Sequence, residues 1–303
     1  MEKLNQLLDK ADSLLLGKRS ELKVALTSLL SGGHLLLEDV PGVGKTTLVY
    51  LFSKLLGLNL NRIQFTNDLL PGDILGTTIF KNSTEEFEFV PGPIFGEMIL
   101  ADELNRATPK TQSALLQVME ERRISVEGKT YELPEEFCLV ATQNPHFQIG
   151  TYPLPESQLD RFFMSLYLDF PKREFEKKIL AQGDLAREID ALACIISKEE
   201  LLVIQSKIEK QIVSEALVDY LLDVMSYGRQ ELQEGSYLSP RASKDLLKAA
   251  KAYSFLEGRD MVLPEDVQAV APHVLGHRLS AARGIRYGHD LITKLLGHVP
   301  VLG

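Results

Sequence analysis

The chain has 303 residues, of which 45% are hydrophobic and 25% are charged, and its formal net charge is −9 at pH 7. These proportions are those of an ordinary globular protein and exclude a disordered or collagen-like chain. The length predicts one large domain, or a core with a smaller appended domain. An acidic chain has no overall basic surface for a phosphate backbone, so we do not expect nucleic acid as its main partner.

Three features of the chain bear on its compartment. Cys138 and Cys194 lie in apolar surroundings without a Cys-x-x-Cys spacing or a nearby metal ligand, so we expect two buried thiols in a reducing environment. The N-terminal segment has charged residues inside its apolar pattern, Asp9 among them, which is unlike a secretory signal. The longest apolar stretch, residues 24–37, is interrupted and shorter than the ~20 residues of a membrane span. We therefore expect a cytoplasmic protein.

The first 170 residues show alternating helical and strand patterns. Apolar residues at helical spacing predict two helices before residue 31, separated at Gly17. Alternation of strands and helices then predicts a parallel sheet that is covered on both faces. The predicted strands are 34–38, 63–66, 98–101, 137–141 and 163–168, and the predicted helices between them include 45–56 and 109–121.

Two predicted hairpins interrupt the alternation of strands and helices, and the last part of the chain has only helical patterns. Residues 78–90 alternate apolar and polar side chains around Asn82-Ser83-Thr84, and residues 124–133 turn at Glu127-Gly128-Lys129, so both predict β-hairpins. After Pro171 only helical periodicity follows, over 172–189, 199–210, 214–230, 240–257 and 264–279. We expect an α/β core over residues 1–170 and an all-helical domain over residues 171–303.

The segment EDVPGVGKTTL, residues 38–48, follows a predicted strand and opens a predicted helix, as a phosphate-binding loop does. The full signature begins with glycine six residues before its lysine, but here that residue is Asp39. We expect Asp39 only to change the turn by which the chain enters the loop. The alternative is a plain helix-capping turn.

The residue types of this loop suit a nucleotide. Glycines at 42 and 44 allow successive main-chain N–H groups to point at one anion, and the following helix N-terminus adds positive potential. Lys45 supplies a full charge to the outer phosphates, and Thr46 is placed to ligate Mg²⁺. The predicted nucleotide-binding residues are Pro41, Gly42, Val43, Gly44, Lys45, Thr46 and Thr47, and we expect ATP and Mg²⁺ as ligands.

Two further strands end in polar residues that suit hydrolysis. MILADE, residues 98–103, places Asp102 and Glu103 at the carboxyl end of a strand, where ligands of open α/β sheets bind. Asp102 suits the inner or outer ligand shell of Mg²⁺, and Glu103 can deprotonate a water that attacks the γ-phosphate. CLVATQNP, residues 138–145, brings Asn144 to the end of a neighbouring strand, where its amide can hold that water. The alternatives are a surface acidic pair and an Asn-Pro turn.

Two arginines are candidates for stabilising the transferred phosphate. Arg161 follows a short helix in LPESQLDRFF, and Arg241 lies in the first turn of a helix in LSPRASKDLL. A guanidinium that reaches the γ-phosphate from a neighbouring subunit contributes about 10³–10⁵ in rate. Arg106 is a further candidate for action in trans. Most arginines are solvated surface charges, which is the alternative for all three.

Five motifs, taken in order, resemble the MoxR family of AAA+ ATPases over essentially the whole chain: EDVPGVGKTT, ADELNRA, ATQNP, LPESQLDRF and LSPRAS. The first two are common to many P-loop ATPases, whereas FVPGPIFGEMILADELNRA and YPLPESQLDRF are far more specific. The resemblance implies a five-stranded core with strand order 5-1-4-3-2 and a C-terminal helical lid. It also implies a ring, usually hexameric, with ATP bound between subunits.

The resemblance also implies residue roles. The hairpin at 78–90 corresponds to the helix-2 insert and the hairpin at 124–133 to the pre-sensor-1 hairpin. The lid motif begins at Leu238, where alanine is more usual. By position, Lys45 and Thr46 belong to Walker A, Asp102 and Glu103 to Walker B, Asn144 is sensor 1, Arg161 is an arginine finger acting in trans, and Arg241 is sensor 2.

Members of this family are similar to chaperones that mature or remodel other proteins, often with a von Willebrand factor A partner. We therefore expect an ATP-hydrolysing remodelling motor. A nucleotide-dependent docking module with little turnover, and a motor subunit of a metal chelatase or of DNA transactions, remain alternatives. His273 and His277 are four residues apart on a predicted helix, but we expect core or surface histidines there rather than a zinc site.

Overall fold

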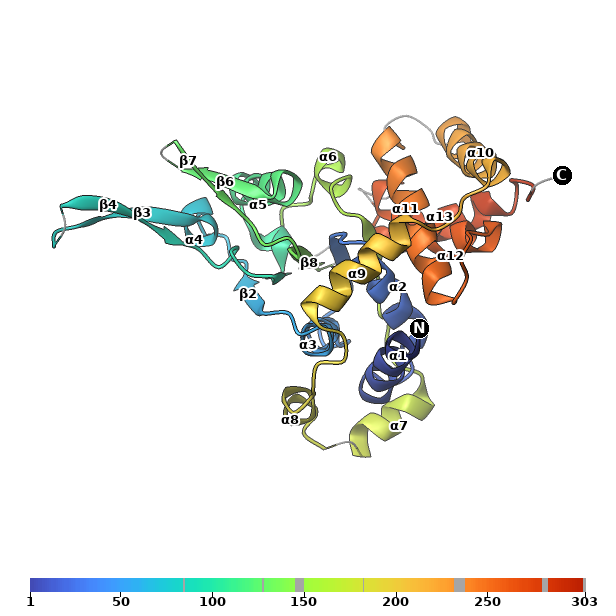
Figure 1. The fold of residues 1–303 in the computed structure, drawn as a ribbon, viewed down its shortest axis with the longest axis horizontal. Coiled ribbons are helices and arrows are strands. Elements are labelled where there is room, and N and C mark those ends of the chain that lie inside the picture. Colours follow the sequence, from blue (N-terminus) through green and yellow to red (C-terminus); the bar gives the residue numbers. More distant parts are fainter. Residues whose placement is uncertain are drawn as a thin grey trace.

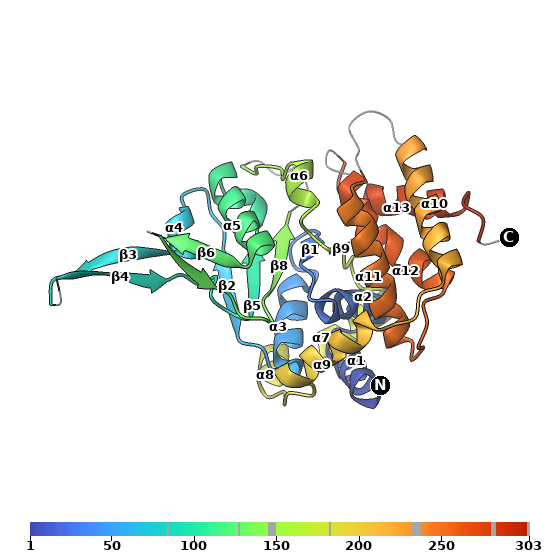
Figure 2. The same cartoon turned by 45° about the horizontal axis from the view of Figure 1, so that its top comes forward.

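The computed structural model describes residues 1–83, 85–126, 128–144, 150–181, 183–231, 238–279 and 283–301. A five-stranded parallel sheet lies at its centre, with strand order β2-β5-β8-β1-β9 (Figures 1 and 2). Numbered along the chain as five core strands, this is the order 5-1-4-3-2, which confirms the predicted α/β class and topology. The strands are β1 (Leu35–Glu38), β2 (Leu60–Gln64), β5 (Met98–Asp102), β8 (Cys138–Gln143) and β9 (Met164–Leu166).

The central strands are buried on both faces, which explains their continuous apolar sequences. Leu35 and Leu37 join one hydrophobic cluster, while Leu36 between them joins another. Met98 and Ile99 on β5 divide in the same way, because successive side chains of a strand point to opposite faces. The first cluster includes α1 (Glu2–Leu14), α2 (Arg19–Leu30) and α3 (Lys45–Leu55), and the second includes α5 (Pro109–Glu121).

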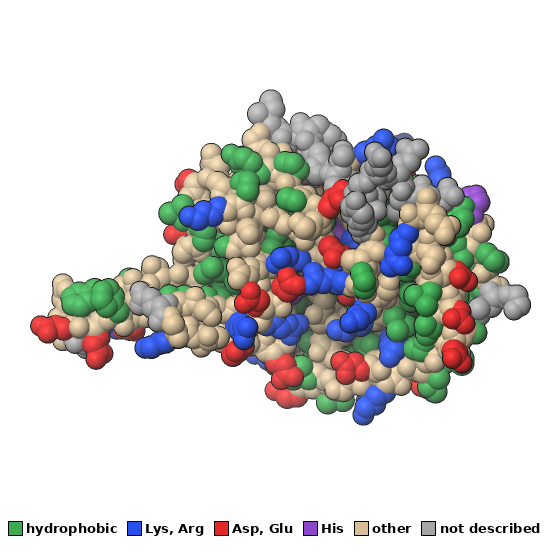
Figure 3. Space-filling model, turned by 90° about the horizontal axis from the view of Figure 1, so that it is seen from above, with side chains coloured by type: hydrophobic (Ala, Val, Ile, Leu, Met, Phe, Trp, Pro, Cys, Tyr) green, Lys and Arg blue, Asp and Glu red, His purple; other side chains and the backbone are tan. Residues whose placement is uncertain are grey.

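Both predicted hairpins are present and form separate two-stranded sheets. The longer one projects from the body of the molecule, and green and red side chains gather near its end in Figure 3. Phe89 stacks on Tyr131 with ring centroids 4.3 Å apart, which joins the two hairpins at their bases. Thr84 and Glu127 of the predicted turns lie outside the described residues. The hairpins are β3 (Gly76–Lys81) with β4 (Glu86–Pro91), preceded by α4 (Pro71–Leu75), and β6 (Arg123–Val126) with β7 (Lys129–Glu132).

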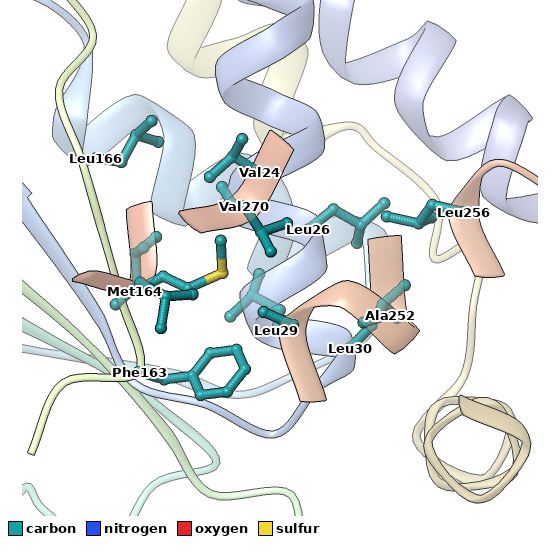
Figure 4. Close-up of a cluster of buried hydrophobic side chains, with 14 of the residues drawn as sticks. Val24, Leu26, Leu29, Leu30, Phe163, Met164, Leu166, Ala252, Leu256 and Val270 are labelled. Atoms are coloured by element: carbon teal, nitrogen blue, oxygen red, sulfur yellow. The ribbon is translucent and has the colours of Figure 1, made fainter. Parts of the chain in front are cut away.

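The C-terminal helices pack against the β9 edge of the sheet and against α2, as Figure 4 shows for one buried cluster. There Leu26 and Leu29 of α2 and Met164 of β9 meet Ala252 and Val270 of the C-terminal helices. None of the helices that the structure describes is long and apolar enough to cross a bilayer. The C-terminal elements are α9 (Lys198–Glu209), α10 (Glu215–Glu231), α11 (Pro240–Leu256), α12 (Pro264–Leu275), η2 (Gly276–Leu279) and α13 (Ile285–Leu296).

The segment between the core and these helices differs from the prediction. The single helix predicted over 172–189 is wrong: α7 (Arg173–Ala181) and α8 (Leu185–Asp190) are separate helices. Asp184 caps α8 by accepting the Arg187 N–H at 3.3 Å, so a new helix starts there. The helix α7 lies beside α1 and the helix α8 beside α3 (Figure 1), and the Phe175 ring covers Gly17. The domain boundary at residue 171 stays a prediction.

Three smaller expectations were also wrong. The second core strand lies at 60–64 rather than 63–66, because pairing with β5 sets its register. The predictions omitted α13, whose apolar residues Ile285, Ile292 and Leu295 recur at helical spacing. Cys138 is buried as expected, but Cys194 is exposed, because it lies in the loop that follows α8.

Candidate active site

The loop between β1 and α3 has the backbone geometry of an anion-binding turn. Gly42 and Gly44 have φ angles of +84° and +99°, in the left-handed region that favours glycine. A Cβ on Gly42 would meet no atom within 4 Å, so the loop opens onto free space there. The helix α3 begins at Lys45, and its first main-chain N–H groups have no partners within the helix. The loop therefore presents donors to an anion.

Lys45 is buried at the start of α3. Its ammonium donates to the main-chain carbonyls of Asp39 and Val40, the latter at 3.0 Å. Burial lowers the pKa of Lys45, while the carboxylates of Asp39 and Asp102 oppose this change. A partly desolvated ammonium surrounded by carbonyl oxygens is suited to exchange them for the stronger acceptors of a phosphate.

A cavity of about 340 Å³ lies between this loop and the carboxyl ends of β5 and β8. It gathers side chains from three strand ends that are far apart in the sequence. Its walls are acidic on one side and carry the loop's donors on the other. The lining residues are Pro41, Gly42, Gly44, Lys45, Thr46, Thr47, Asp102, Glu103, Thr142 and Asn144.

Glu103 lies directly after β5 with its carboxylate held by polar neighbours. Asn144 Nδ2 donates to one carboxylate oxygen at 3.2 Å. Gln64 Nε2 and Arg106 Nη1 donate to the other, at 3.2 and 2.9 Å. The backbone of Glu103 has φ +58°, a sparsely populated conformation for a residue with a side chain, which is often found at functional sites. The strand thus ends in a turn that directs this carboxylate into the cavity.

Asp102 is the more enclosed of the two acids. Thr142 Oγ1 donates to one of its oxygens at 2.7 Å, and Arg62 Nη2 donates to the other at 2.7 Å. The residues fit a magnesium ion bound with a nucleotide, because Thr46 brings a hydroxyl to the same cavity as this carboxylate. With both oxygens engaged, Asp102 suits the outer ligand shell of the ion better than the inner one.

Several residues of the site were not among the predicted ones. Asn105 is buried and clamps the main chain of Asn144: its Nδ2 donates to the Asn144 carbonyl at 2.9 Å, and its Oδ1 accepts the Asn144 N–H at 3.3 Å. Arg62 and Gln64 reach the acids from β2. The polar residues of the motif ADELNRA could have indicated Asn105 from the sequence alone. Arg62 and Gln64 reach the site only because their strand pairs with its neighbour.

Arg161 and Arg241 do not line this cavity. Arg161 Nη1 lies 3.1 Å from Glu120 Oε2, and Arg241 Nη2 contacts Glu120 Oε1. The structure thus brings the two predicted arginines together at the C-terminal end of α5. Arg106, by contrast, pairs with Glu103 of its own chain.

A second cavity of about 180 Å³ opens beside the loop and shares Gly42, Gly44 and Thr47 with the first. Its other walls are mostly apolar, which suits the flat face of a nucleobase rather than a phosphate. They come from the end of α1 and the segment after it, from the loop itself and from residues after β9: Leu14, Leu15, Leu16, Lys18, Val43, Pro171, Ile179 and Leu185.

His277 is buried in the core, and His273 is half-buried beside it. Both contact Ser165 of β9, together with His289 of α13, and desolvation lowers the pKa of all three imidazoles. Within the described ranges, no group of three or more His, Cys, Asp or Glu residues is arranged to hold a metal ion. These histidines join the sheet to the lid.

Comparison with known proteins adds to this geometry. Residues 34–164 match the ATPase family associated with various cellular activities (AAA), and residues 229–289 match the AAA lid domain. The chaperone MoxR1 of Mycobacterium tuberculosis is 42% identical over 275 residues, which cover 88% of this chain and 72% of MoxR1. The chain belongs to the MoxR family of AAA ATPases. Nucleotide binding is a property of this AAA family.

Other relatives match over most of their length. YeaC of Bacillus subtilis is 44% identical, and the match covers 92% of this chain and 88% of YeaC. The protein MoxR of Paracoccus denitrificans is 31% identical, and the match covers 88% of this chain and 86% of that protein. A crystal structure of an ATPase candidate from Cytophaga hutchinsonii superimposes with a TM-score of 0.82 and 36% identity, covering 100% of this chain and 96% of that one. The MoxR resemblance and fold expected from the sequence motifs are thereby confirmed.

Proposed function

We propose that this MoxR-family chain hydrolyses ATP to ADP and phosphate with Mg²⁺, and uses the energy to remodel or mature partner proteins. One observation carries the proposal: Glu103 and Asn144 are in contact at 3.2 Å in the same cavity as the glycine-rich loop and Lys45. A carboxylate, an amide and an ammonium around one cavity are suited to position water for in-line attack on a phosphate and to stabilise the charge that develops.

The residues take distinct roles in this reaction. The loop amides and Lys45 bind the β- and γ-phosphates, while Thr46, with Asp102 in the outer shell, would hold Mg²⁺, which neutralises phosphate charge. Asn144 orients the attacking water, and Glu103 accepts its proton. The bond from γ-phosphorus to its bridging oxygen breaks as the bond to the water oxygen forms. Glu103 is prepared for this by Asn144, which holds its carboxylate in place.

We place the base of the nucleotide in the apolar cavity beside the loop. Its walls include Leu15 and Ile179, so they come from segments on both sides of the loop in the sequence. Competition of ATP and of GTP with a fluorescent nucleotide measures whether the site prefers adenine to guanine.

A homo-oligomeric ring, with six subunits as the usual number for the family, is part of the proposal. Arg161 and Arg241 lie away from the cavity of their own chain, which supports their action on a neighbouring subunit's nucleotide. The relative MoxR1 is a chaperone, which supports a protein client for this chain. A von Willebrand factor A domain protein is the partner we would test first.

The deciding experiment compares phosphate release by the wild type and Glu103→Gln at saturating Mg-ATP. We expect ATP binding in both and hydrolysis only in the wild type. Equal rates would contradict the role of Glu103. ATP binding without measurable release by the wild type would instead indicate a docking module with little turnover.

A mixing experiment tests the shared site. Arg161→Ala should assemble and bind ATP without hydrolysing it, and Lys45→Ala should fail to bind ATP. A mixture of the two should regain activity, because some interfaces combine an intact loop with an intact arginine. A mixture as inactive as its parents would exclude action in trans.

A further inference from the structure

Glu120, near the end of α5, contacts both candidate arginines at once. Its Oε2 lies 3.1 Å from Arg161 Nη1 and its Oε1 contacts Arg241 Nη2. Arg161 Nη1 also donates to the Leu116 carbonyl at 2.9 Å, one turn earlier on the same helix. One carboxylate therefore bridges the two guanidinium groups, although the two arginines are 80 residues apart in the sequence.

The residues next to the two arginines in the fold are hydrogen-bonded to one another. Asp160, the residue before Arg161, accepts the Ser239 hydroxyl at 3.0 Å, and Ser239 caps the helix that carries Arg241. Arg278 donates to Asp160 at 2.8 Å, and its side chain is only 1% exposed. The core segment with Arg161 and the lid helix with Arg241 are thus one connected unit, and α5 completes it through Glu120.

Charge explains why this unit needs a carboxylate. Two guanidinium groups that bind the same carboxylate are like charges that repel each other, and the shared carboxylate offsets that repulsion. Each arginine has five N–H donors, and Glu120 occupies only part of them, so donors remain for a phosphate. The side chains of Arg241 and Glu120 are each 40% exposed and that of Arg161 is 29% exposed, so a neighbouring molecule can reach this surface.

We propose that Glu120 is a positioning residue that holds Arg161 and Arg241 together as one pair directed at the nucleotide of a neighbouring subunit. This inference rests on the proposed ATP hydrolysis. It assigns the arginines to one donor unit rather than to two separate sites, and it makes Glu120 necessary for turnover without contact to ATP in its own chain.

The first test is Glu120→Gln in the full-length protein, measured by steady-state ATP hydrolysis. We expect kcat to fall by about 10²-fold, the loss typical of a misplaced group, with KM for ATP unchanged. Glu121→Gln is the matched control: it removes the same charge from the next residue, whose only ion pair in the described part of the chain is a distant one to Arg123, and it should keep wild-type kcat. Wild-type or higher kcat in Glu120→Gln would overturn the proposal.

The second test separates positioning from a general structural role. Glu120→Gln mixed with Lys45→Ala should regain activity, because Lys45→Ala subunits contribute an intact arginine pair to the intact loop of Glu120→Gln subunits. A mixture without regained activity would contradict the proposal. If thermal unfolding shows that Glu120→Gln is unfolded, Glu120→Asp replaces it in the same mixture and is judged by the same outcomes.

The two proposals fail in different ways. Absence of hydrolysis by the wild type would refute the ATPase function itself. Hydrolysis by the wild type together with normal turnover in Glu120→Gln would refute only the role of Glu120.

Discussion

The carboxylate of Asp39 accepts the main-chain N–H of Leu168 at 2.8 Å, across 129 positions of the sequence. The same oxygen accepts the N–H of Asp169 at 2.7 Å, while the other accepts that of Val40 at 2.8 Å. Asp39 stands where the phosphate-loop signature has glycine. The departure from the signature therefore ties the start of the loop to the segment just after β9, in addition to altering the entry turn.

Replacing Asp39 by glycine restores the signature but removes this tie. We expect Asp39→Gly to lower the free energy of unfolding by about 1–3 kcal/mol, because buried N–H groups lose their acceptor. Urea denaturation measures this, and ATP affinity should fall with it. Asp68→Gly, in an exposed turn, is the control. If Asp39→Gly kept its stability and bound ATP more tightly, the glycine of the signature would matter more than the hydrogen bonds of Asp39.

Asn105 should support turnover through the main chain of Asn144. Asn105→Ala removes the amide that holds the main chain of Asn144 in place. We expect kcat to drop about 10²-fold, the loss typical of a displaced catalytic group, while the Kd for ATP stays the same. Single-turnover hydrolysis and nucleotide titration separate the two quantities. Asn82→Ala, on the exposed hairpin turn, should behave like the wild type. An equal effect in both variants would speak against this clamp.

His34 makes stability depend on pH. Leu139 N–H donates to its Nδ1 at 3.1 Å, and its Nε2 lies 3.2 Å from the Met119 carbonyl, which fits the neutral tautomer protonated at Nε2. Desolvation lowers the pKa of His34 from 6.5 to about 4. The unfolded chain therefore binds the extra proton between these values, so this stabilisation is complete above pH 6.5 and is lost as pH falls towards 4.

Because of His34, the free energy of unfolding should be about 2 kcal/mol lower at pH 5 than at pH 7. His34→Gln, which does not titrate, should show a smaller loss over the same interval when urea denaturation is repeated at each pH. The buried imidazoles near Ser165 will leave some pH dependence in both proteins. Identical pH profiles for the two would show that His34 is not a source of the effect.

Arg278 should be required for the junction of core and lid. Besides Asp160, it pairs with Asp245 of α11. We expect Arg278→Ala to destabilise the protein by about 3–5 kcal/mol, because two partly buried carboxylates lose their partner. Arg187→Ala is the control: the side chain of Arg187 is 88% exposed in its ion pair, so its removal should change stability little. Chemical denaturation of the two variants makes the comparison, and similar midpoints would refute the expectation.

Local sequence patterns were sufficient for the parts of the site that lie next to each other in the chain. The loop at 41–47 has its strand before it and its helix after it, and Asp102 and Glu103 end a strand as expected. The predicted helix over 172–189 shows the limit of such patterns. Its periodicity continues past residue 183, but the cap at Asp184 and the packing of α8 on α3 divide it.

By itself, the sequence predicted the α/β class, the strand order implied by its motifs, a glycine-rich loop between a strand and a helix, and two acids at the carboxyl end of β5. Spacing along a chain reports which face of an element a residue occupies, and the ends of parallel strands share one edge. Only the tertiary structure decided that Asp39 holds β9, that Arg62 and Gln64 reach the acids, and that Arg161 and Arg241 meet at Glu120. These contacts join distant segments, and their geometry depends on the packing of every element between them, which no local spacing records.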